Sequence, residues 1–199
     1  MTSGLSPADF DELHDFVKVQ VAAGYASFDD IVDEAVEVFD GALPDPQALR
    51  AAATAITEQS IAAHVRDQAQ WPEMTDCDRL DAAFAELDGL GILARQHYSC
   101  CGTCGSNDIR IEMGQAAAAR GFTFFHIQDT EHAVGGEFLY LSYGSATADR
   151  TDAVAIGREV VDTLSRHGLR PSWDGRHVNR IGLPLTWQRR RRAHVHACR

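Results

Sequence analysis

Residues 98–144 constrain the fold most, because they contain two short segments that are apolar on both faces. These segments, 122–128 and 137–143, are rich in aromatic and branched residues and are separated by a loop that contains Gly135-Gly136. The pattern predicts an antiparallel hairpin. Because side chains alternate between the two faces of a strand, such a hairpin must be covered on both sides, and we expect helices to cover it.

The flanking residues predict an α+β fold. We expect a strand over 92–98, a helix capped by Ser106 and running to about Arg120, a helix from Thr147 or Asp149 to Gly168, and a second hairpin of 169–173 with 176–187 around Asp174-Gly175. The expected order is strand–helix–hairpin–helix–hairpin. It would form a mostly antiparallel sheet, on which a helical N-terminal half packs.

The first 90 residues predict helices. Ser6, Ser27 and Thr75 each precede an apolar stripe with helical spacing, and serine and threonine are favoured N-cap residues. From composition and pattern we divide the chain into an acidic helical segment at 1–75, an α+β domain at 76–188 and a basic tail at 189–199.

Charge and composition narrow the class of protein. The net charge is -11, and residues 1–90 carry four basic and 19 acidic side chains, which disfavours nucleic acid as a partner. Arg189–Arg192 is interpreted as a solvated terminus. No apolar run is long enough to span a membrane, and the polar start lacks signal-peptide features. We therefore expect a cytoplasmic protein, with no membrane partner, that binds another protein or a small molecule.

The cysteine cluster allows three interpretations. A C-x-x-C pair, Cys101 and Cys104, can supply two zinc ligands, with Cys100 or His97 as a third. Other possible ligands are Cys77, His126 and His132. As a redox pair, the same thiols would lie between a strand and a helix N-terminus, although Ser106 as N-cap would place the helix start beyond Cys104. As inert residues, they would simply fill a tight turn, because free cysteine is among the most buried residue types.

A second candidate site lies near the turn of the hairpin predicted for 122–128 and 137–143. His126, Asp129, Glu131 and His132 would bring two imidazoles and two carboxylates to a loop, where they suit general acid–base catalysis or a hard metal ion. The alternative is structural: His126 would share a buried face with two phenylalanines, and Asp129 would bond to loop amides.

No complete catalytic pattern is present. The chain contains no glycine-rich phosphate loop, G-x-S-x-G elbow, H-E-x-x-H or EF-hand pattern, so catalysis is not assigned. The leading hypothesis is a non-catalytic binding or interaction module. The alternatives are a zinc-binding domain that uses residues 100–104, and a thiol-dependent redox enzyme with Cys101 as nucleophile and Cys104 as resolving partner.

The combination of CCGTCG, GFTFFHIQDTEHAVGGEFLYLSYG, WDG and RIGLPLTW resembles an uncharacterised bacterial family, the domain of unknown function DUF6891. The resemblance covers about Leu80 to Trp187. It implies no activity, cofactor or catalytic residue.

Overall fold

The chain folds into two compact units. The structure is a computed structural model that describes residues 6–42, 45–116, 118–147 and 149–191. One unit combines Met1–Pro72 with Gln188–Arg199, and the other is Glu73–Trp187.

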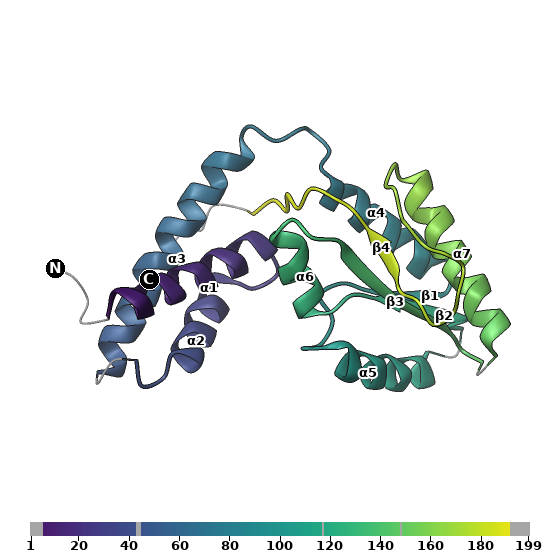
Figure 1. The fold of residues 1–199 in the computed structure, drawn as a ribbon, viewed down its shortest axis with the longest axis horizontal. Coiled ribbons are helices and arrows are strands. Elements are labelled where there is room, and N and C mark those ends of the chain that lie inside the picture. The colour runs from purple at the N-terminus through teal and green to yellow at the C-terminus, as the bar shows by residue number, and fades with distance from the viewer. Residues whose placement is uncertain (1–5, 43–44, 117, 148, 192–199) are drawn as a thin grey trace. The chain divides into compact units, whose positions relative to one another are not determined.

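Three helices build the first unit, and local capping sets where they start. They are α1 (Pro7–Ala23), α2 (Phe28–Val38) and α3 (Pro46–Gln68) (Figure 1). The side chain of Ser6 caps α1, and Ser27 forms a capping box with Asp30 at the start of α2, as predicted. Gly24 ends α1 with φ +82°, a conformation that glycine adopts without strain.

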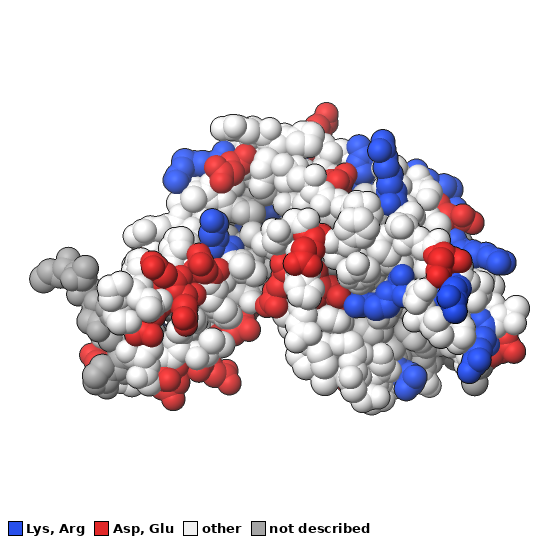
Figure 2. Space-filling model, in the orientation of Figure 1, with Lys and Arg blue, Asp and Glu red and all other residues white. Residues whose placement is uncertain are grey.

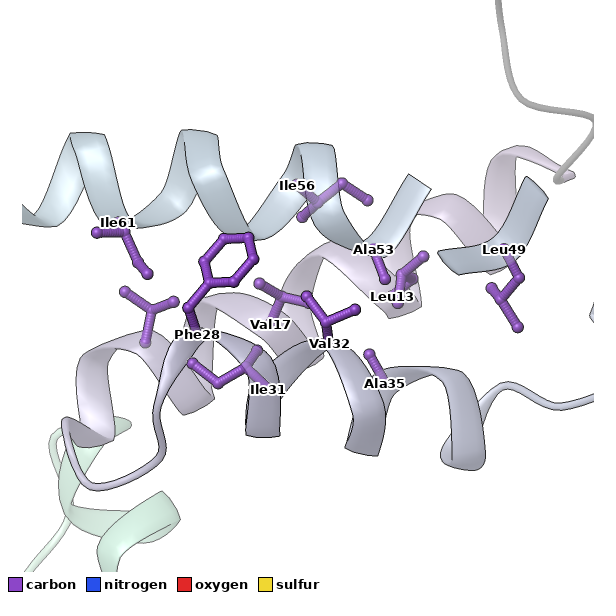
Figure 3. Packing of buried hydrophobic residues seen from close by; sticks show 11 residues of the cluster. Leu13, Val17, Phe28, Ile31, Val32, Ala35, Leu49, Ala53, Ile56 and Ile61 are labelled. Carbon is purple, nitrogen blue, oxygen red and sulfur yellow. The ribbon is translucent and has the colours of Figure 1, made fainter. Parts of the chain in front are cut away.

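The core of this unit lies between α3 and the pair α1 and α2. Figure 3 shows apolar side chains of the three helices pointing toward one another. The buried cluster comprises Leu13, Val17, Val21, Phe28, Ile31, Val32, Ala35, Leu49, Ala53, Ile56 and Ile61. The acidic side chains of α1 and α2 point outward, on the left of Figure 2. The charge bias of the first half of the chain is therefore carried by the solvent-facing sides of folded helices.

The end of the described chain packs on the same helices. Arg191 donates hydrogen bonds to the carbonyls of Val21 (2.7 Å) and Ala26 (2.8 Å), and its backbone N–H donates to the Gln68 side chain (2.9 Å). The interpretation as a solvated terminus is therefore wrong for residues 189–191, because the carbonyls at the end of α1 need a donor. Residues 192–199, the remainder of the predicted basic tail, lie outside the described residues.

The second unit contains a four-stranded sheet in the order β1-β2-β3-β4. The strands are β1 (Ile92–Arg95), β2 (Gly121–Phe124), β3 (Leu139–Ser145) and β4 (Ile181–Leu183). β1 pairs with β2 in parallel, and the two other pairings are antiparallel. The α+β prediction with a mostly antiparallel sheet is confirmed.

Helices cover both faces of this sheet, as predicted from the two apolar faces of the central strands. They are α4 (Asp76–Gly89), α5 (Gly102–Gln115), α6 (Ile127–Val134) and α7 (Arg150–Arg166). α7 packs on β2 and β3, with Ile156 against Gly121. α5 packs on the opposite face of β2, where Gly105 lies against Phe124.

The first predicted hairpin is wrong in its connection. β2 and β3 do pair antiparallel, with Phe122 opposite Gly144, but β2 ends at Phe124 and α6 lies between the strands. His126 therefore belongs to a helix start and not to a strand. The eight residues of α6 are too few to show a clear helical period in the sequence.

The second predicted hairpin is reduced to one short contact. Ser172 forms an isolated bridge with Gly182, and β4 pairs with β3 instead. Asp174 accepts a hydrogen bond from the Arg176 N–H at 3.0 Å, which makes the predicted turn an Asx-turn.

Candidate functional site

The three cysteines meet at the N-terminus of α5. Cys101 is the N-cap residue, in an extended conformation, and Cys104 lies in the first turn. Cys100 is exposed, and the sulfur atoms of all three lie within 4.8 Å of one another. The prediction that Ser106 is the N-cap is wrong. Its hydroxyl bonds back to the Gly102 carbonyl at 2.7 Å, inside the first turns of the helix.

The helix start distributes charge unevenly among these thiols. The backbone amide of Cys104, followed by its thiol and the Thr103 amide, lowers the pKa of Cys101 through hydrogen bonds. Hydrogen bonds with the thiols of Cys100 and Cys101, and the charge of those groups, raise the pKa of Cys104 to about 11. Negative charge is therefore favoured on Cys101 over Cys104.

The loop that carries the cluster has an unusual backbone. His97 and Ser99 have φ angles of 51° and 63°, in the left-handed region that residues other than glycine rarely adopt. Two backbone hydrogen bonds hold the loop against the corner between β2 and α6: the Tyr98 N–H donates to Phe125 at 2.8 Å, and the Ile127 N–H donates to Ser99 at 3.2 Å. Such strain persists only where the surroundings enforce it.

Side chains reinforce this loop from two helices. The Ser99 hydroxyl donates to Asp108 of α5 at 2.8 Å, and the His97 Nδ1 hydrogen-bonds the Thr130 hydroxyl of α6 at 2.9 Å. The cysteine cluster is therefore presented by a turn that is fixed on several sides. The sequence contains no glycine at 97 or 99 that would have indicated left-handed residues there.

The second candidate site is a helix start. His126 is the N-cap of α6, and its Nδ1 accepts a hydrogen bond from the Asp129 N–H at 3.3 Å. The Asp129 carboxylate accepts from the His126 N–H at 3.0 Å and is 2% exposed. Burial is the main cause that lowers the pKa of His126. The two residues form a reciprocal capping box, which gives both polar side chains a structural role.

A cation that sequence reasoning missed completes this network. Arg180 donates to both carboxylate oxygens of Asp129, at 2.9 and 2.5 Å, in a bidentate ion pair. The sequence signals this cation only indirectly. A buried aspartate requires a cationic or hydrogen-bonding partner, but the spacing of residues does not show where in the sequence that partner lies. Glu131 is half-buried and His132 is exposed, and neither belongs to a metal-binding group among the described residues.

The structure brings the two candidate sites together. Gly102, between Cys101 and Thr103, lies against the imidazole of His126, and a Cβ at this position would be 3.5 Å from Nε2. His126, one member of the His126–Asp129–Arg180 network, thus contacts the start of α5, where the thiols lie.

The cysteine cluster is the group with ligand chemistry. Cysteine, histidine and carboxylate side chains can all bind metal ions. Within the described part of the chain, the group whose ligand atoms lie close enough together to hold one is Cys100, Cys101 and Cys104. His97 bonds to α6 and is not one of them. Cys77 is buried on α4, and Cys198 lies outside the described residues. Three thiols so arranged suit a soft metal ion or thiol chemistry.

Comparison with known proteins identifies one relationship. A family model described as a domain of unknown function, DUF6891, matches residues 6–191. The match includes the acidic helices as well as the segment around the cysteines. No curated protein and no solved structure matches the chain. Among the described residues, no helix combines the length and apolarity needed to cross a membrane.

Proposed function

The chain belongs to the DUF6891 family, and we propose that in this member the cysteine cluster binds a thiophilic metal ion, with Zn²⁺ as the first candidate. The observation that carries the proposal is the approach of three sulfur atoms to within 4.8 Å of one another on a single fixed turn. Thiolate ligands select zinc and Cu(I) over hard ions such as Mg²⁺ and Ca²⁺.

The spacing suits a tetrahedral ion. A Zn–S bond is about 2.3 Å long, so two sulfurs on one zinc ion are roughly 3.8 Å apart. The three sulfurs, which lie within 4.8 Å of one another, would have to close to that separation by side-chain rotation. A rigid turn lowers the conformational entropy that must be lost on binding, and the hydrogen bonds at His97 and Ser99 provide that rigidity.

Three protein ligands leave one coordination position for another molecule. Because no fourth ligand atom joins the group within the described residues, water or a ligand from outside would complete the tetrahedron. Structural zinc sites are normally closed by four protein ligands, whereas sites that act on other molecules keep an open position. We therefore propose a site that exchanges its metal or its fourth ligand, at an exposed helix terminus.

Metal analysis of the purified protein tests the proposal. Protein prepared without chelator should carry about one zinc ion per chain by elemental mass spectrometry, and the Cys101→Ser/Cys104→Ser variant should carry none. Cys77→Ala is the matched control, because this buried thiol lies outside the cluster, and it should retain the metal. Wild-type protein that stays metal-free after incubation with zinc and buffer exchange would refute the proposal.

The interaction-module hypothesis stays a prediction beside this one. An exposed metal whose fourth position is filled by a partner would satisfy both. Metal content distinguishes the metal site from an interaction module that binds no metal. Such a module predicts no zinc in the wild type or in the Cys101→Ser/Cys104→Ser variant.

A further inference from the structure

We infer that the metal-free cluster is also a dithiol that reduces disulfide bonds of other molecules, with Cys101 as the attacking thiol and Cys104 as the resolving thiol. The inference uses the ligands of the proposed metal site but does not require a metal to bind. Its substrate class is an exposed disulfide, either in a small molecule or on a protein surface.

The position of Cys101 selects it as the attacking group. Cys101 is the N-cap residue of a 14-residue helix, α5, whose first-turn amides have no acceptor within the helix. These amides and the helix dipole favour negative charge on the attacking sulfur. The side chain is half-buried, so an incoming disulfide can reach it.

Geometry selects Cys104 as the resolving partner. An N-cap residue and the residue three positions later have Cα atoms roughly 5–6 Å apart, which lies within the range of about 4.4–6.8 Å for a disulfide. The adjacent residues Cys100 and Cys101 have Cα atoms about 3.8 Å apart, too close for an unstrained disulfide. The sulfurs of Cys101 and Cys104 need only close from within 4.8 Å.

The exchange proceeds in two balanced steps. The Cys101 thiolate attacks one sulfur of the substrate disulfide, the substrate S–S bond breaks, and the second substrate sulfur leaves as a thiolate that takes a proton from water. Cys104 then loses its proton to water and attacks the Cys101 sulfur, which releases the first substrate sulfur as a thiolate that also takes a proton from water. The substrate gains two electrons and two protons, and the protein retains a Cys101–Cys104 disulfide.

Metal binding and exchange exclude each other in this scheme. A metal ion occupies the sulfur lone pairs that would attack, and the disulfide leaves only Cys100 of the three ligands. The zinc-loaded protein should therefore be inert toward disulfides, and the oxidised protein should not take up zinc.

The test uses oxidised glutathione on the reduced, full-length chain after chelator treatment. We expect two glutathione thiols released per chain and a disulfide that peptide mass spectrometry places between Cys101 and Cys104. Cys104→Ser should stop at a mixed disulfide on Cys101, Cys101→Ser should be unreactive at the cluster, and Cys100→Ser should react like the wild type. Cys77→Ala is the control for a thiol outside the cluster, and circular dichroism verifies that each variant is folded.

Several outcomes would overturn the inference. These are a Cys100→Ser variant that loses the disulfide, glutathione adducts spread over Cys100 and Cys101 in the Cys104→Ser variant, or wild-type protein that forms no intramolecular disulfide. The two proposals fail separately: zinc uptake without disulfide formation refutes this inference alone, and disulfide formation without zinc uptake refutes the metal site alone.

Discussion

At the scale of single residues, the position of α5 depends on the absence of a side chain. Gly105 faces the sheet, and a Cβ there would lie 2.6 Å from the ring of Phe124, which is fully buried. The glycine therefore lets the first turns of α5 approach β2 closely and places the thiols at the edge of this contact. Gly114 in the same helix has nothing within 4 Å of the equivalent point.

These two glycines make a matched pair of substitutions. Gly105→Ala should lower the free energy of unfolding, because the overlap with Phe124 costs about 1–3 kcal/mol and the gain in helix propensity is only about 1 kcal/mol. Gly114→Ala should raise it by up to about 1 kcal/mol, because the propensity gain is not opposed. Urea denaturation midpoints measure both effects. Equal shifts in the same direction would contradict the close approach of α5.

At the scale of elements, the sequence predicts the helix starts that are capped by residues close to them in the chain. The caps at Ser6, Ser27 and Thr75 are confirmed, because each is formed by a hydroxyl and an amide three residues later. The helix starts at Cys101 and His126 were missed, since neither residue is a typical N-cap. Residues from distant segments stabilise these starts, such as Arg180, which pairs with Asp129, 51 positions away.

For the same reason, the sequence predicted which residues form each of the two candidate sites but not that the two sites are in contact. The sequence indicated thiols at 100–104 and polar groups at 126–132. Their contact through Gly102 and His126 depends on the parallel pairing of β1 with β2, which brings the ends of both strands to the same edge of the sheet. Spacing along the chain carries no information about that pairing.

The end of α1 provides a prediction about an element. Arg191→Gln should lower the free energy of unfolding by about 1–2 kcal/mol, because it removes a cation and hydrogen-bond donors from two carbonyls in the last turn of α1 and from the Ala26 carbonyl in the loop after it. Burial lowers the pKa of Arg191, because it disfavours the charged guanidinium. This cost of burial offsets part of the stabilisation that the charge provides at the end of α1. Arg66→Gln is the control, since Arg66 is exposed on α3. Chemical denaturation followed by circular dichroism should show a clear loss for the first variant and little change for the second.

At the scale of the whole molecule, one histidine links the stability of the helical unit to pH. The Nε2 of His64 lies 2.9 Å from the Arg189 carbonyl, and its ring packs edge-on against Trp71. Burial is the main cause that lowers the pKa of His64 from its value of 6.5 in an unfolded chain. Between these two pKa values the unfolded state binds more protons, so this contribution to stability is complete above pH 6.5 and is lost as the pH falls.

The unfolding midpoint of the helical unit should therefore decline below about pH 6.5. His64→Gln should make this decline shallower, because glutamine keeps a donor for the Arg189 carbonyl and does not titrate. His14→Gln is the control, since this residue is exposed on α1. A decline that is equally steep in wild type and His64→Gln would exclude His64 as its source.

The hydrogen bond between Arg191 and Gln20 spans 171 positions of the chain. During synthesis, α1 leaves the ribosome well before its final contact exists, because translation adds about 5–20 residues per second. The sheet-containing unit, Glu73–Trp187, is complete in the nascent chain before the segment that contains Arg191 is synthesised. Helix α1 is thus made long before Arg191, one of the residues that completes its hydrogen bonding.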